Sequence, residues 1–146
     1  MFVARLGTIF SLVLLAVVGI VHAEEPQEKE KLQGVWVSTE VLSGGKKQEI
    51  EVTLKFVDDT VTITTKGRPA EKCTYSIAAE NSPAHMDIMM ERRGNKVTLP
   101  AIYEIKNVQL RICHAVRPSG ARPKSLTGDA DTVLFSCKKV DRKDKE

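Results

Sequence analysis

Few side chains beyond residue 23 could act as nucleophiles or metal ligands, and they are two histidines and three cysteines: His85, His114, Cys73, Cys113 and Cys137. Cys113 and His114 are adjacent, an arrangement that could suggest a nucleophile with its base or a shared metal ion. Successive side chains of a strand point to opposite faces, so a strand over these residues keeps the two groups apart. A structural zinc site takes four ligands, and no Cys-x-x-Cys or His-x-His spacing supplies them. We therefore predict no bound metal and no cofactor.

The odd number of cysteines allows at most one disulfide bond and leaves at least one free thiol. A bond between Cys113 and Cys137 would close a loop of 25 residues, stabilising the fold by roughly 3 to 4 kcal/mol if it constrains the unfolded chain. Cys137 is in phase with Val133 and Phe135, whereas the facing of Cys113 is ambiguous, so the sequence leaves both the bridge and free thiols open. Cys73 is interpreted as a small buried apolar side chain.

Three methionines and two arginines are the remaining candidates for binding. Met86 and Met90 share one strand face and Met89 lies on the other, so the three thioethers cannot meet at one copper ion. We interpret them as core or pocket-lining residues. Arg111 and Arg122 are candidates for contacts with an anion or with a long loop, and the alternative for each is an ordinary surface charge.

Hydrolases and nucleotide-binding enzymes carry recognisable motifs that this sequence lacks. It has no Gly-x-Ser-x-Gly turn, no His-Glu-x-x-His helix and no glycine-rich phosphate loop. The carboxylates of Asp87, Glu91 and Glu104 are isolated and are interpreted as solvent-facing groups. We therefore expect the protein not to be an enzyme.

The chain has 146 residues and a formal net charge of +3 at pH 7, and its composition changes at residue 23. A basic start at Arg5, a largely apolar stretch over 6–21 and small residues before a cut after Ala23 are typical of a secretory signal peptide. We predict its cleavage and a secreted or periplasmic location. A retained membrane anchor is the alternative, but 16 residues reach only ~24 Å as a helix, short of the ~30 Å hydrocarbon core. No membrane span is expected after cleavage.

The sequence after the predicted cut has 123 residues and a net charge of +2. This length suits a single domain. Interspersed charges of both signs give no electrostatic footprint for DNA or RNA, so no nucleic-acid partner is expected. We divide this part of the chain into a polar leader or short helix over 24–31, one domain over 32–140 and a charged tail over 141–146.

Apolar and polar residues alternate with a period of two through most of the domain, which indicates β-strands with one buried face. Short turns separate these runs, so neighbouring strands must be antiparallel. We predict an all-β antiparallel meander of about eight strands, and because an open sheet would expose its edges, we expect it to close into a barrel. One long connection, 115–131, would cross the barrel mouth or be a mobile excursion. The predicted strands cover 35–42, 50–56, 60–66, 72–77, 85–91, 99–106, 108–114 and 132–138.

The segment Leu32-Gln33-Gly34-Val35-Trp36 resembles the start of a secreted, lipocalin-like domain family of unknown function that is expanded in planctomycete bacteria. Segments around Cys73-Thr74-Tyr75, Ile102-Tyr103-Glu104 and Arg122-Pro123 extend the resemblance over nearly all of 32–138. The family usually has glycine where this chain has Ala101. The resemblance implies a barrel and a cell-envelope location, and it implies no catalytic residues.

Gly34-Val35-Trp36 also resembles the Gly-x-Trp motif of true lipocalins. In those proteins the tryptophan packs at the closed end of the barrel, under a basic residue from the last strand. The resemblance leaves three candidates for that basic residue, which are Lys138, Lys139 and Arg142.

Two functions follow as hypotheses. In the first, the barrel is a non-catalytic binding domain for a small apolar molecule, because an eight-stranded barrel can hold one small ligand. In the second, the barrel is filled and serves as a structural or protein-interaction module of the cell envelope. An interior cavity of a few hundred Å³ would separate the two. The residues predicted to face the interior are Trp36, Leu54, Phe56, Tyr75, Tyr103 and Phe135.

Overall fold

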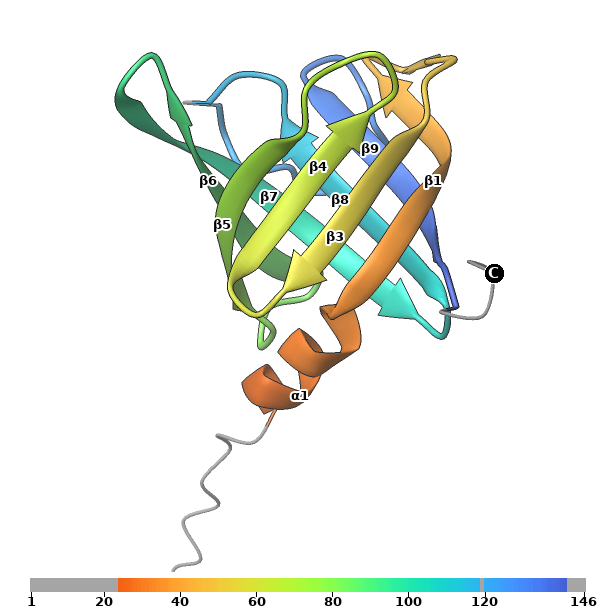
Figure 1. Cartoon of the computed structure of the whole chain (residues 1–146), viewed down its shortest axis with the longest axis vertical. Coiled ribbons are helices and arrows are strands. Elements are labelled where there is room, and N and C mark those ends of the chain that lie inside the picture. The colour runs from red at the N-terminus through yellow and green to blue at the C-terminus, as the bar shows by residue number, and fades with distance from the viewer. Residues whose placement is uncertain (1–23, 119, 142–146) are drawn as a thin grey trace, which may run out of the picture.

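The computed structural model describes residues 24–118 and 120–141, which form one short helix and nine strands (Figure 1). The predicted signal peptide and most of the predicted charged tail lie outside the described residues. The elements in chain order are α1 (Glu24–Leu32), β1 (Gly34–Ser43), β2 (Lys46–Lys47), β3 (Val52–Val57), β4 (Thr60–Thr65), β5 (Glu71–Ala78), β6 (Ala84–Arg92), β7 (Asn95–Lys106), β8 (Gln109–Ala115) and β9 (Thr132–Lys139).

The strands form one antiparallel sheet that closes on itself, as the sequence predicts. From β3 to β9 each strand pairs with the next in the chain, and β1 pairs with both β3 and β9. Eight strands thus make the barrel wall, and the two-residue β2 adds a small hairpin to the upper part of β1. A β-bulge between Ser38 and Glu40 interrupts the pairing of β1 with β9. Closure leaves the wall without a long free edge.

Alternation along each strand sends one set of side chains into the barrel. On β3, for example, Val52, Leu54 and Phe56 are buried while Lys55 and Val57 are exposed. On β6 the inward positions are Met86, Ile88 and Met90, with Met89 on the other face, as predicted. The inward side chains of all eight wall strands join one apolar cluster, which supplies the main hydrophobic stabilisation of the fold.

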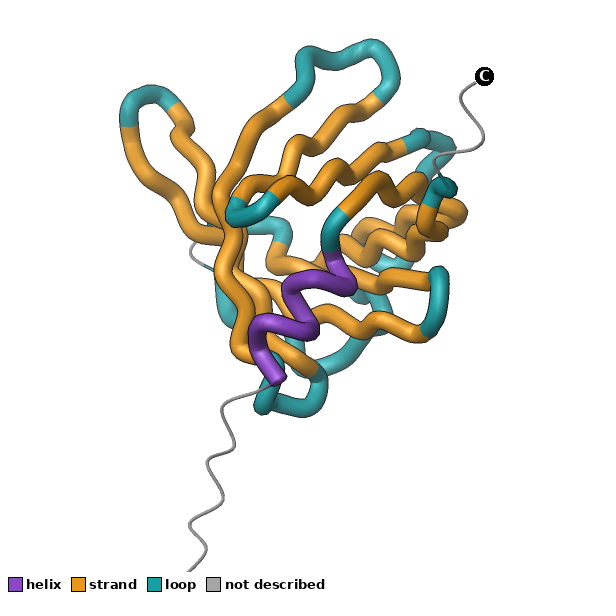
Figure 2. Tube along the Cα trace, turned by 60° about the horizontal axis from the view of Figure 1, so that its bottom comes forward, coloured by secondary structure: helices purple, strands orange, loops and turns teal. Residues whose placement is uncertain are grey.

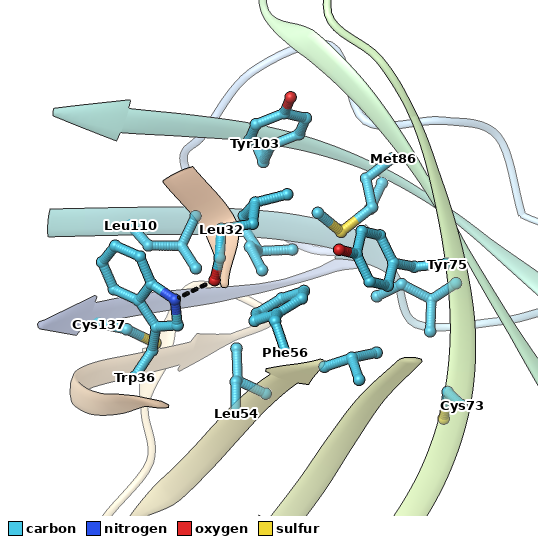
Figure 3. Close-up of a cluster of buried hydrophobic side chains, with 14 of the residues drawn as sticks. Leu32, Trp36, Leu54, Phe56, Cys73, Tyr75, Met86, Tyr103, Leu110 and Cys137 are labelled. Carbon is cyan, nitrogen blue, oxygen red and sulfur yellow. Dashed lines mark hydrogen bonds between the residues drawn. The ribbon is translucent and has the colours of Figure 1, made fainter. Parts of the chain in front are cut away.

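Helix α1 closes one end of the barrel. Figure 2 shows it lying across that end, with the strands arranged around it. The helix is almost entirely polar, but its last residue, Leu32, is completely buried in the core. The indole Nε1–H of Trp36 donates a hydrogen bond of 2.8 Å to the Leu32 carbonyl oxygen (Figure 3). The end of the helix is thereby fixed to the first strand.

Lys139 is the basic residue that covers Trp36. Its Nζ lies 5.1 Å from the centre of the indole ring, a cation–π distance, and it donates a hydrogen bond of 3.2 Å to the Lys31 carbonyl oxygen. Gly34 makes room for this side chain: its φ is +115°, and a Cβ there would lie 3.2 Å from Lys139 Cε. Of the other two candidates, Lys138 is exposed on the adjacent position of β9, and Arg142 lies outside the described residues.

Gln33 ties α1 to the turn between β3 and β4. Its Oε1 accepts a hydrogen bond of 2.7 Å from the Asp58 amide, and its Nε2 donates to the Tyr75 hydroxyl at 3.1 Å. The Tyr75 hydroxyl in turn donates to the Asp58 carbonyl oxygen at 2.8 Å. Lys29 forms an ion pair with Asp59 in the same turn. The Leu-Gln-Gly-x-Trp segment therefore acts as one unit that closes this end of the barrel, called the closed end below.

The described residues of the long connection after β8 lie against the outer wall of the barrel, so the predicted crossing of the barrel mouth is wrong. Leu126 packs on a second apolar cluster formed by Ile102, Cys113 and Leu134, which point outward from β7, β8 and β9. Gly128 sits so close to the wall that a Cβ would lie 2.8 Å from Leu42 Cβ. The connection covers an apolar strip that would otherwise meet solvent.

We expect Trp36→Phe to lower the free energy of unfolding by about 2 to 4 kcal/mol. The change leaves the buried Leu32 carbonyl without its donor and removes the aromatic face that Lys139 covers. Val108→Ala, at a half-exposed position on the surface, is the matched control and should change stability by no more than about 0.5 kcal/mol. Urea unfolding followed by circular dichroism measures both values, and equal losses in the two variants would contradict this account of the closed end.

Candidate functional site

The barrel contains a cavity of about 530 Å³ in the half away from α1. Its wall is built from inward positions on all eight wall strands, with β5 contributing only Glu71, and it reaches the segment before β3 and the turn between β4 and β5. These strand ends lie at the end of the barrel opposite the helix (Figure 1), called the open end below. The volume lies within the range of small-molecule sites, roughly 300 to 1,000 Å³.

The six residues predicted to face the interior divide between the cavity and the core beneath it. Leu54, Phe56 and Phe135 line the cavity. The other three, Trp36, Tyr75 and Tyr103, are buried in the packed core toward the closed end (Figure 3). Phe56 joins the two regions, because its ring contacts the Tyr75 ring edge-on at a centroid distance of 5.1 Å.

Most of the cavity wall is aliphatic. Apart from Met90, sequence reasoning did not single out these positions for a ligand site, and all but Ile50 share the inward phase of their strands with the predicted residues. An apolar wall of this kind favours an apolar ligand through the hydrophobic effect. The aliphatic and thioether side chains that line the cavity besides Leu54 are Val41, Ile50, Val52, Val61, Ile63, Ile88, Met90, Leu99, Ile112 and Val133.

Polar and charged side chains gather where the wall reaches the open end. Lys66 and Arg68 belong to the turn between β4 and β5, and Arg92 ends β6. Glu71, at the start of β5, lies 3.9 Å from Arg92, as measured between Oε1 and Nε. Sequence reasoning did not single out these four residues, and only the closure of the barrel brings them to one rim.

His114 is the imidazole of the cavity wall. It continues the inward series Leu110, Ile112 on β8, and its ring lies 5.5 Å from that of Phe135. Its Nδ1 is 2.7 Å from the Ala115 carbonyl oxygen, so the proton sits on Nδ1 and Nε2 is left as a hydrogen-bond acceptor. Burial lowers the pKa of His114 from its ordinary value of 6.5, against the raising effect of that hydrogen bond. The imidazole is therefore neutral at pH 7.

The barrel wall is split between β5 and β6 at its upper end. Their pairing stops at Thr74 and Met89, so residues 71–73 pair with β4 alone and residues 90–92 with β7 alone. A groove of about 450 Å³ runs along this split, and Cys73 and Met90 are among its lining residues. Both side chains are almost fully buried, and Met90 also lines the cavity. The two sulfur-containing side chains thus separate the cavity from the outer groove.

Arg111 and Arg122 both make loop contacts. Arg111 Nη2 donates a hydrogen bond of 2.6 Å to the Leu126 carbonyl oxygen. Arg122, within the long connection, donates to the carbonyl oxygens of Met86 and Ala101 at 3.1 and 2.7 Å, and to Asp87 Oδ1 at 2.6 Å. Their guanidinium groups fasten the connection to the outer wall, away from the cavity.

The three cysteines are free thiols, and the bridge considered between Cys113 and Cys137 is wrong. Cys137 points into the barrel beside Leu110, whereas Cys113 points outward into the cluster under the long connection. The thickness of the sheet separates them. Burial raises the pKa of the Cys137 thiol to about 12, and burial together with Glu71 raises that of Cys73 to about 11, so both thiols remain protonated and unreactive at neutral pH.

The described residues contain neither a grouped set of metal ligands nor a membrane-spanning helix. Within 24–118 and 120–141, no three His, Cys, Asp or Glu side chains are grouped so that they could hold a metal ion. In the same part of the chain, no helix has the length and apolar character needed to cross a membrane.

Comparisons with known proteins add no relative: no family model, no curated protein and no solved structure matches the chain. The resemblance to a secreted lipocalin-like family therefore stays a prediction.

We predict three thiols per chain in denaturing buffer both before and after reduction. Ellman's reagent measures this number directly, and a count of one before reduction would show that a disulfide forms. In native buffer the reaction should be slowed to the rate at which the barrel opens, because all three side chains are buried.

His114 should make the folded protein less stable as the pH falls. Its pKa is lower in the folded state than in the unfolded chain, so below pH 6.5 the unfolded chain binds more protons and the free energy of unfolding decreases. This loss begins near pH 6.5 and ends once the pH is below the pKa of the folded state.

Urea unfolding at steps between pH 7.5 and 5 measures this dependence. His114→Gln should flatten it, while His85→Gln, on the outer face of β6, serves as the control for loss of a histidine. A slope that persists unchanged in the His114 variant would disprove the assignment.

Proposed function

We propose that this protein is a secreted, non-catalytic, lipocalin-like domain that binds a small apolar molecule inside its barrel. The observation that carries the proposal is the cavity of about 530 Å³ with a mainly aliphatic wall. The alternative of a filled barrel acting as an envelope module has less support, because this cavity lies among the inward side chains of the barrel. Secretion rests on the signal-like residues 1–23 and on the resemblance of the Leu-Gln-Gly-x-Trp segment.

The arrangement of the cavity favours binding over catalysis. Its wall holds one imidazole, His114, and the carboxylate of Glu71 lies at the rim beside Arg92 rather than beside that imidazole. A general acid–base mechanism needs a titratable group within hydrogen-bond reach of a reacting atom, usually oriented by a second polar group. The hydrogen bond of His114 goes to its neighbour's carbonyl oxygen, which fixes the ring and adds no activating carboxylate.

Filling the cavity should abolish binding. An uncharged fluorescent probe of apolar sites, 1-aminoanthracene, should bind the full chain with a stoichiometry near one and increase its emission. Ile63→Trp places an indole into the cavity from β4, and it should weaken this binding at least tenfold.

Thr64→Trp is the matched control, because it adds the same side chain one residue along β4 on the exposed outer face. It should bind the probe like the original protein. Absence of binding to the original protein, or equal binding by both variants, would overturn the proposed function.

A further inference from the structure

We propose that the ligand is a single-chain amphiphile whose negatively charged head lies among Lys66, Arg68 and Arg92 at the open end, with its apolar chain in the cavity. The inference rests on the proposed function and adds the chemistry of the ligand. It comes from the way charge is distributed over the cavity wall. The charged side chains among the lining residues are these three cations and one carboxylate, Glu71.

The rim carries an excess of positive charge that its own contacts do not neutralise. Among the described residues, Glu71 Oε1 is 3.9 Å from Arg92 Nε, and the exposed side chains of Lys66 and Arg68 form no ion pair. With one carboxylate facing three cations, the rim has a net charge of about +2. An anion placed there would gain attraction from each cation, and a guanidinium offers paired N–H donors that suit a carboxylate or a phosphate.

The deeper part of the cavity determines the chemistry of the ligand's chain, which must be apolar. Away from these charged residues the lining side chains are aliphatic, aromatic or thioether down to Leu54 and Phe56, apart from Ser43, Gln48, Thr65 and His114. A charged group buried at this depth would lose its hydration without an opposite charge to compensate. The head must therefore stay at the rim while the chain points toward the closed end.

Orientation also follows from the packing at the closed end. Leu32 and Trp36 are completely buried there, and Lys139 lies over the indole. Within the described residues the lining of the cavity includes no residue of α1, whereas it extends to the three cations at the open end. The ligand thus enters with its apolar end first.

A matched set of ligands tests the head group. Dodecanoate, 1-dodecanol and dodecylammonium share a twelve-carbon chain and differ in charge, and displacement of 1-aminoanthracene at pH 8 and low salt gives their affinities for the full chain. We expect dodecanoate to bind roughly three- to tenfold more tightly than dodecylammonium, the size expected of a few solvent-exposed ion pairs. Each methylene added between octanoate and dodecanoate should tighten binding about fourfold, equivalent to ~0.8 kcal/mol.

Charge-removal variants locate the head. The triple variant Lys66→Gln, Arg68→Gln, Arg92→Gln should weaken dodecanoate binding three- to tenfold and leave 1-dodecanol within twofold. The control variant Lys55→Gln, Lys124→Gln, Lys138→Gln removes the same charge from exposed positions outside the cavity lining and should leave both affinities unchanged. Raising the salt concentration to 0.5 M should weaken dodecanoate binding to the original protein and have little effect in the rim variant.

A lysophospholipid with a twelve-carbon chain and an anionic glycerol phosphate head distinguishes a membrane-derived amphiphile from a free fatty acid. The proposal is supported if dodecanoate or the lysophospholipid binds more tightly than 1-dodecanol and dodecylammonium, and if only the rim variant loses this preference. Equal affinity for all heads, or losses shared by the rim and control variants, would overturn it. Failure of 1-aminoanthracene itself to bind would instead remove the proposed function, so the two failures are distinct.

Discussion

The hydrogen bond from the Trp36 indole to the Leu32 carbonyl oxygen joins the helix to the wall, and the rest of the structure is organised around it. Lys139 covers the same indole, so the first and last strands meet at this point. Gln33 and Tyr75 extend the contact to the turn after β3. The side chains at the closed end pack against one another and can hold the strands in register. The wall around the cavity lacks some of the packing contacts of a filled core, so it depends on that support.

The sequence was sufficient to predict most strands of the barrel wall, because apolar and polar residues alternate with a period of two in a strand that is buried on one face. Closure followed from the need to remove sheet edges. The role of α1 was not accessible in the same way. The helix is almost entirely polar, and it acts through its last residue, Leu32, and through backbone carbonyl groups that carry no sequence signal. The short β2 and the bulge at Ser38 are similarly decided by pairing partners distant in the chain.

For the candidate site, the inward phase of the six predicted residues was correct, but the sequence could not separate those that fill the barrel from those that line its cavity. That division depends on the volume left between strands. The sequence does contain a signal for the position of the long connection. Around Ile102, Cys113 and Leu134 the strands are apolar on both faces, which is typical of a wall covered outside as well as inside. The arginines that fasten the connection bind backbone oxygens, and such partners cannot be read from residue types.

The pairing of β1 with β9 has a consequence for how the chain reaches this structure. Residues 36 and 139 become neighbours only when the whole meander is in place, so the contact that closes the barrel spans nearly the entire domain in sequence. Contacts of such long range form late and slowly in folding, because the loop between them must first be ordered. A growing polypeptide therefore cannot complete the barrel before its last strand has been synthesised, because β1 and β9 supply the two sides of the closing seam.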